Sequence, residues 1–166
     1  MGTRSYIAKD IGKGKYKVIF CQLDGDLEIT GKLLAEHYNT PEKVDALLAL
    51  GDIYFLGEQL EPNPALPHNW YENNYQKDVT LAIGRDCGEY HWPAEEMTLE
   101  NMEDNDEGIE FIYIFTPDQE WKYCCVMAPD ARWRNVRNEL AADDDFPNQN
   151  SEAQDCEESS DPVLSM

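Results

Sequence analysis

The alternation of apolar and polar positions is clearest at the start of the chain, where it predicts a β-hairpin. Residues 3–8 and 16–23 are two strand-like runs, and the segment between them contains Gly12 and Gly14. A short glycine-containing segment between two such runs is typical of a hairpin loop. The second run includes residues 18–21 (VIFC), which are apolar on both faces, so we expect this strand near the middle of a sheet.

A second hairpin is predicted further along the chain. Residues 109–115 and 121–126 are rich in β-branched and aromatic side chains, and residues 116–119 (TPDQ) separate them. Proline at the second turn position, followed by aspartate, suits a type I turn. Residues 53–56 and 79–83 are shorter apolar runs that we interpret as further strands.

The intervening pattern predicts two helices in succession. Residues 27–38 place apolar side chains at helical spacing. The next helix has clear boundary signals, with Thr40 as the N-cap, Pro41 in the first turn and Gly51 at the C-terminal stop.

Three later segments are less regular. Residues 58–78 are rich in proline and asparagine and predict a long surface loop. Residues 93–106 predict an acidic helix with few apolar anchors. Residues 131–140 predict a closing helix that carries three arginines.

Together these elements predict an α+β fold: an antiparallel sheet of four or five strands, with two or three helices packed on one face. Residues 1–140 are long enough for a single domain. Residues 141–166 offer almost nothing to bury, and we interpret them as an acidic disordered tail that is dispensable for folding.

The composition restricts the compartment. No apolar run approaches the length of a bilayer span, and no charged-then-apolar leader opens the chain. The five cysteines include no CxxC pair, which is unlike a zinc ribbon or a disulfide scaffold. We therefore expect a soluble protein of a reducing cytoplasm, without membrane contact.

The charge is the extreme feature of the composition, at a formal net value of −21, and it is concentrated in two blocks that contain no lysine or arginine. The first block comprises Glu95, Glu96, Glu100, Glu103, Asp104, Asp106, Glu107 and Glu110. The second comprises Glu139, Asp143, Asp144, Asp145, Glu152, Asp155, Glu157, Glu158 and Asp161. Because the rest of the chain is nearly balanced, the blocks indicate interaction surfaces or a tail; the alternative is that they only keep the protein soluble.

Motifs for catalysis or metal binding are absent from the sequence. The histidines at 37, 68 and 91 do not fall at metal-ligand spacing. Serine nucleophile elbows, Walker loops and GxGxxG fingerprints do not occur. We therefore predict no catalytic residue, no metal and no cofactor.

One polar constellation stands out near the predicted strand ends. It consists of Arg4, Asp24, Arg85, Asp86 and Glu89. We favour a salt-bridge cluster that ties loops together. The alternative is a pocket for a small anionic ligand, in which the two arginines act as forked donors.

Several of these segments resemble one family of proteins. The segments are MGTRS at 1–5, the Asp-Gly corner at 24–25, EHYN at 36–39 and RDCGE at 85–89. They are similar to a family of small uncharacterised proteins encoded by tailed phages and prophages of bacteria. That family has Trp before the Asp-Gly corner and Tyr-Pro after it, whereas this chain has Leu23 and Asp26-Leu27. The resemblance implies a phage origin, and hence the cytoplasm of a bacterial host, but no reaction.

Three functional hypotheses follow. The leading one is a non-enzymatic phage protein that inhibits a host defence protein, such as a CRISPR effector or a restriction enzyme, by presenting the first acidic block as a mimic of DNA or RNA. The second is a binder or sponge for an anionic ligand such as a nucleotide, through Arg4 and Arg85. The third is a weak enzyme with Asp24 or Glu89 as general base. Direct binding of nucleic acid is disfavoured because the sequence has no basic stripe.

Overall fold

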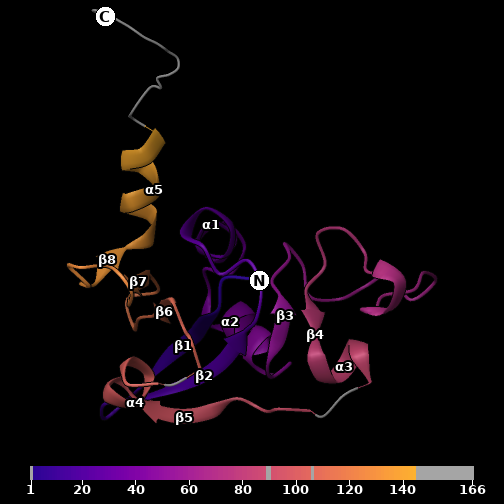
Figure 1. Cartoon of the computed structure of the whole chain (residues 1–166), viewed down its shortest axis with the longest axis horizontal. Coiled ribbons are helices and arrows are strands. Elements are labelled where there is room, and N and C mark those ends of the chain that lie inside the picture. Colours follow the sequence, from indigo (N-terminus) through magenta and orange to yellow (C-terminus); the bar gives the residue numbers. More distant parts are fainter. Residues whose placement is uncertain (1, 89–90, 106, 145–166) are drawn as a thin grey trace, which may run out of the picture. The chain divides into compact units, whose positions relative to one another are not determined.

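The computed structural model describes residues 2–88, 91–105 and 107–144 (Figure 1). The chain divides into two units, with the boundary between Val136 and Arg137. Of the predicted tail, residues 141–166, only residues 141–144 are among the described residues. No helix in the described part of the chain is long and apolar enough to cross a membrane.

The first unit is built on one mixed sheet. The strands that the structure describes are β1 (Ser5–Gly12), β2 (Lys15–Cys21), β3 (Ile53–Phe55), β4 (Leu81–Ala82), β5 (Glu95–Thr98), β6 (Phe111–Phe115), β7 (Trp121–Cys125) and β8 (Arg134–Asn135). Their order is β4-β3-β2-β1-β6-β7-β8, and β5 pairs with β2 beside that path. β1 pairs with β6 in parallel, as β2 does with β3. The prediction of an antiparallel sheet of four or five strands was therefore wrong in both strand number and sheet type.

Both predicted hairpins are confirmed. β1 and β2 pair antiparallel from Ser5 opposite Cys21 onward, and β2 lies inside the sheet as expected. β6 and β7 pair antiparallel with Tyr113 opposite Tyr123. In their turn the Gln119 N–H donates to the Thr116 carbonyl at 2.9 Å, which is the bond of a four-residue turn.

The two predicted helices after β2 are also confirmed. The first is a π-helical turn, η1 (Leu27–Gly31), that continues into α1 (Lys32–His37). The second is α2 (Pro41–Leu48), where the Thr40 side chain accepts a hydrogen bond from the Lys43 N–H at 3.3 Å. Gly51 follows with φ +75°, a value that favours glycine.

Three further helices differ from the expectations. α3 (Ile83–Cys87) directly follows β4 and was not predicted. α4 (Leu99–Glu103) is only the second half of the predicted acidic helix, because residues 95–98 pair with β2 as β5. α5 (Val136–Asp144) begins five residues later than predicted, since β8 occupies residues 134–135.

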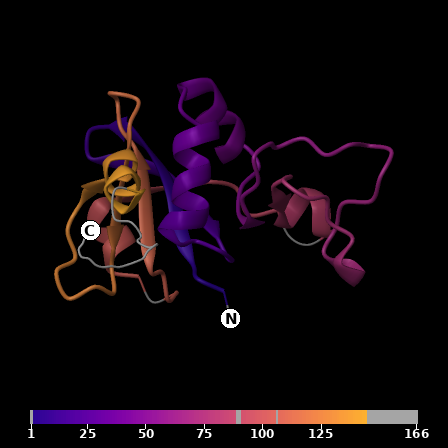
Figure 2. The same cartoon turned by 90° about the horizontal axis from the view of Figure 1, so that it is seen from above.

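The long predicted loop between β3 and β4 is present, with one 3₁₀ turn, η2 (Tyr71–Asn73). In Figures 1 and 2 it extends to the side of the sheet away from the β6–β7 hairpin, as the strand order requires.

Helical segments cover one face of the sheet. Ile7, Ile19 and Tyr113 share this face because they are partners in the strand register. A Cβ at Gly31, the last residue of η1, would lie 3.2 Å from the Tyr113 ring. The Trp121 indole N–H donates to the Tyr38 carbonyl, just after α1, at 2.8 Å. This close packing accounts for the glycine inside the first helical segment.

α4 covers the other face. Tyr6, Ile112 and Ile114 lie on that face, and the fully buried Met102 of α4 packs in the same core cluster. Helices therefore cover both faces of the sheet, whereas the sequence predicted one. The few apolar residues of the acidic segment are what hold α4 against the sheet.

Candidate functional site

The described residues of the first acidic block lie on β5, on α4 and in the segment that leads to β6 (Figure 1). We call residues 95–110 the acidic ribbon. Its exposed carboxylates are Glu95, Glu96, Glu100, Glu103, Asp104 and Glu107. Glu110 is half-buried, and Asp106 lies outside the described residues. Among the residues that the structure describes, no ribbon carboxylate is in an ion pair with Lys, Arg or His.

Local hydrogen bonds give the ribbon a defined shape. The Thr98 hydroxyl caps α4 by accepting from the Asn101 N–H at 3.1 Å. The Asn105 side chain accepts from the Glu107 N–H at 3.0 Å and donates to the Met102 carbonyl at 2.9 Å. Ile109 is buried, at 2% exposure. The carboxylates therefore project from a backbone that is anchored at both ends.

A pocket of about 130 Å³ opens at the inner edge of the ribbon, and we call it the acidic pocket. It is lined by Tyr6, Val18, Ile19, Phe20, Asp52, Trp92, Glu95, Met97 and Glu107. Its three carboxylates come from three separate segments of the chain. No three His, Cys, Asp or Glu side chains in the described ranges are placed to hold a metal ion.

Asp52 is the least exposed of these carboxylates and is held by the backbone around it. Its carboxylate accepts from the Phe20 N–H at 2.9 Å, and its own N–H donates to the Trp92 carbonyl at 2.9 Å. Burial, with the nearby charges of Glu95 and Glu107, raises its pKa from 3.8 to about 6, while the hydrogen bond from Phe20 and the charge of His91 act in the opposite direction. Asp52 therefore changes charge near neutral pH.

Tyr6 and Glu107 form a second pair in this pocket. The Tyr6 hydroxyl donates to the Glu107 carboxylate at 3.0 Å. Burial raises the pKa of Tyr6, and so do this hydrogen bond and the neighbouring negative charges. The phenol therefore keeps its proton and orients Glu107.

Trp92 is held at the pocket by its backbone, and the residue as a whole is 53% exposed. A Cβ at Gly51 would lie 2.2 Å from the Trp92 carbonyl oxygen, so only glycine fits there. The segment that carries Trp92 thus packs directly on the residue before Asp52.

The predicted polar constellation is brought together only in part. Arg85 and Asp86 form a two-pronged ion pair, with Nε at 2.7 Å and Nη2 at 2.9 Å from the carboxylate oxygens. Arg85 also donates to the Thr80 carbonyl at 3.1 Å and lies 3.7 Å from Glu61. Asp86 further accepts the Ala82 N–H at 2.7 Å. Through these contacts the pair connects α3 to β4, to the residue before β4 and to the preceding loop. This is the kind of role that a salt bridge between loops has.

The remaining members lie elsewhere. Arg4 donates to the Glu107 carbonyl at 3.4 Å, so it contacts the acidic ribbon rather than Arg85 in the contacts that the structure gives. Asp24 has φ +58°, and its carbonyl accepts the Thr30 hydroxyl at 2.6 Å. Glu89 lies outside the described residues.

The Asp-Gly corner itself packs against residues of β1 and β6. A Cβ at Gly25 would lie 2.7 Å from the Ser5 hydroxyl oxygen, and the Tyr113 hydroxyl donates to the Gly25 carbonyl at 2.6 Å. Both contacts secure the connection between β2 and η1. The corner is thus accounted for by packing.

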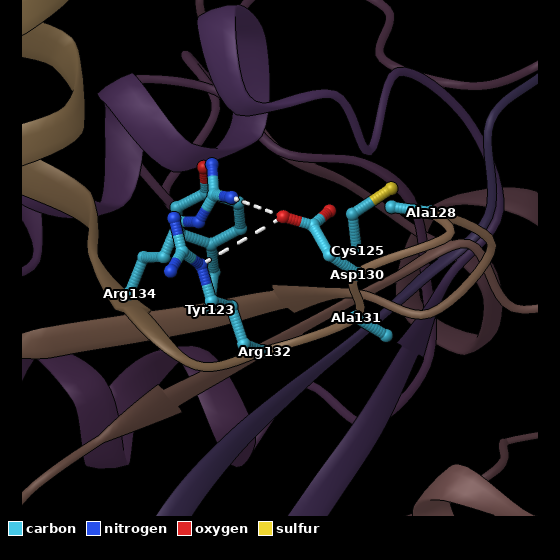
Figure 3. Close-up of a pocket in the computed structure, with 7 residues that line it drawn as sticks. All are labelled: Tyr123, Cys125, Ala128, Asp130, Ala131, Arg132 and Arg134. Atoms are coloured by element: carbon cyan, nitrogen blue, oxygen red, sulfur yellow. Dashed lines mark hydrogen bonds and ion pairs between the residues drawn. The ribbon is translucent and has the colours of Figure 1, made fainter.

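A second, smaller pocket of about 80 Å³ is formed by β7 and the loop before β8 (Figure 3). The guanidinium groups of Arg132 and Arg134 both point toward the Asp130 carboxylate, at 3.9 and 3.3 Å. The Cys125 sulfur points away from them. Two arginines can bind a small anion, but here both of them already form ion pairs with the Asp130 carboxylate.

Sequence reasoning found the ribbon but missed the acidic pocket. Glu95 and Glu107 were recognised as members of the acidic block, whereas Tyr6, Asp52 and Trp92 were not singled out. The only signal for Asp52 was its place directly after a helix-terminating glycine, which does not indicate what it faces.

The chain matches no protein-family model, no curated protein and no solved structure.

Proposed function

We propose that this is a non-enzymatic binding protein that attaches, through the acidic ribbon, to a protein surface that otherwise binds DNA or RNA. The observation that carries this proposal is that β5, α4 and the segment after them expose six carboxylates on an anchored backbone, and that none of the six is in an ion pair among the described residues. Unpaired charges of one sign create a field that attracts a partner of opposite sign.

The class of partner follows from the charge. Nucleic-acid-binding surfaces are lined with lysine and arginine that neutralise a row of phosphates. A row of carboxylates can occupy such a surface, and charge complementarity accelerates the encounter. The resemblance to phage proteins extends the proposal: the protein is phage-encoded, and the partner is a defence protein in the cytoplasm of the bacterial host.

The ligand-sponge alternative has less support. The guanidinium of Arg85 is already engaged by Asp86, Thr80 and Glu61. Arg4 contacts the ribbon instead. An anionic ligand would have to displace these internal acceptors.

The decisive experiment compares two variants with the same change in net charge. The first reverses Glu96, Glu100, Glu103 and Asp104 to lysine. The control reverses Glu28, Glu42, Glu58 and Asp118, which are exposed outside the ribbon. A partner is captured from a bacterial lysate with the unmodified protein and purified, and its affinity for each form is then measured by calorimetry.

We expect the ribbon variant to lose at least about tenfold in affinity and the control to lose much less, because charges opposite the interface dominate the attraction. Binding should weaken between about 0.05 and 0.5 M salt, and DNA or RNA should compete for the partner. Unchanged affinity of the ribbon variant would refute the proposal. Loss of binding on Arg4→Ala or Arg85→Ala instead would favour the ligand sponge.

A further inference from the structure

The acidic pocket combines charge with apolar walls, which distinguishes it from the rest of the ribbon. Asp52, Glu95 and Glu107 supply the negative charge, and Phe20, Trp92 and Met97 supply apolar surface. Glu95 and Glu107 belong to the ribbon as well, so the pocket opens onto the surface that we propose as the interface.

The charge of the pocket is not compensated by an ion pair within the described part of the chain. The groups that face Asp52 are Glu95, Glu107, His91 and the neutral phenol of Tyr6. Two of these repel its negative charge, whereas His91 and the hydrogen bond from the Phe20 N–H offset part of it. A cation that entered the pocket would relieve this repulsion.

The apolar walls select the kind of cation. Trp92 is an exposed residue, at 53%, that lines the pocket beside the carboxylates, and a cation next to an aromatic side chain is favourable. A metal ion does not fit, since no three ligating side chains in the described ranges are grouped for one. A guanidinium is planar, carries five N–H donors and stacks on aromatic rings, so it can use both the walls and the carboxylates.

We propose that the acidic pocket receives an arginine side chain of the partner protein. This inference depends on the proposed function, because it assumes that a basic partner docks on the ribbon. Arginine is abundant on nucleic-acid-binding surfaces and is among the residues that contribute most to interfaces. The ribbon then supplies attraction over its length, while the pocket supplies a specific anchor.

The inference is tested first with a small probe, N-acetyl-arginine methylamide, and its neutral isostere N-acetyl-citrulline methylamide. Binding is followed by NMR through the indole N–H of Trp92, which Trp92→Phe assigns. We expect a saturable shift with the arginine probe and none with the citrulline probe. Equal shifts with both probes, or no shift with the arginine probe, would overturn the inference.

Matched variants then locate the site. Glu95→Gln, at an exposed position, and Asp52→Asn should each weaken binding of the arginine probe at least about fivefold, whereas Glu42→Gln on α2 should leave it unchanged. Binding should tighten as the pH rises from about 5 to 7, because Asp52 becomes charged, and Asp52→Asn should remove most of that dependence. Retained affinity in both pocket variants would place the probe elsewhere and overturn the inference.

The partner assay separates the two proposals. Glu95→Gln should also weaken partner binding at least about fivefold. If Glu95→Gln leaves partner binding intact while the ribbon variant abolishes it, the pocket inference fails and the proposed function stands. If the ribbon variant binds the partner normally, the proposed function fails, and with it the assignment of the arginine to that partner.

Discussion

Asp52 shows how the surroundings of one residue change its chemistry. Asp52 follows Gly51, just beyond the end of α2, and its side chain is half-buried between β2 and the segment that carries Trp92. Burial and two neighbouring carboxylates raise its pKa from 3.8 to about 6. Ionising this group therefore costs free energy in the folded protein that it does not cost in the unfolded chain.

The first prediction concerns the dependence of stability on pH. Because the folded-state pKa of Asp52 is raised, the folded protein binds its proton more tightly between about pH 4 and 6. The contribution of Asp52 is fully present below its unfolded pKa and is lost as the pH rises through about 6. At pH 8 the free energy of unfolding of Asp52→Asn should therefore exceed that of the unmodified protein by about 1–2 kcal/mol, after allowance for solvent screening. The variant should accordingly unfold at a higher denaturant concentration.

At pH 4 the two proteins should differ little, since both then carry a neutral side chain that can accept the Phe20 N–H. Asp118→Asn, in the exposed turn between β6 and β7, provides the control for removing one carboxylate at an exposed position. Parallel stability curves for Asp52→Asn and the unmodified protein would contradict the prediction.

At the scale of elements, β6 is an inner strand of the sheet, and its side chains are buried on both faces. It pairs with β1 on one side and β7 on the other. Ile112 and Ile114 face the core beneath α4, whereas Tyr113 and Phe115 face the opposite side. Because side chains alternate along a strand, a single pattern of five apolar residues serves both cores.

The second prediction tests this assignment. Ile112 is completely buried, so Ile112→Ala should reduce the free energy of unfolding by roughly 2–5 kcal/mol. Ile11, near the end of β1, is 43% exposed, and Ile11→Ala should cost less than about 1 kcal/mol. Both values come from denaturant titrations. A nearly neutral Ile112→Ala would show that the inward face of β6 is assigned incorrectly.

At the scale of the whole molecule, much of the negative charge is concentrated in two segments of the chain, the acidic ribbon and the second acidic block. The ribbon lies along the first unit, and the second block begins within α5. The residues after α5 include Asp145, Glu152, Asp155, Glu157, Glu158 and Asp161, with no lysine or arginine. A segment of this composition has little apolar surface that folding could bury.

The third prediction follows from that composition. A chain that ends at Asp144, where α5 ends, should keep its thermal midpoint within a few degrees of the full chain, as measured by circular dichroism. It should also keep its affinity for the partner, because the ribbon is intact. A large fall in the midpoint would mean that the removed residues contribute to the folded state.

The sequence by itself determined what depends on near neighbours: the two hairpins, the Thr40 cap and Pro41 start of α2, the long loop after β3, and the presence of the acidic block. These follow from side-chain periodicity and turn chemistry over a few residues. Tertiary structure alone decided how the pieces join. The parallel pairing of β1 with β6, and the hydrogen bond between Tyr6 and Glu107, connect residues about one hundred positions apart.

The acidic segment shows the physical reason. Its local pattern fits a helix, yet residues 95–98 pair with β2, since an open strand edge offers hydrogen bonds and apolar contact to Met97. Local propensity is worth only fractions of a kcal/mol per residue, which such pairing and burial exceed. The same packing brings Asp52, Glu95 and Glu107 around one pocket. The sequence thus determined that negative charge would be concentrated, and the tertiary structure decided which carboxylates would meet.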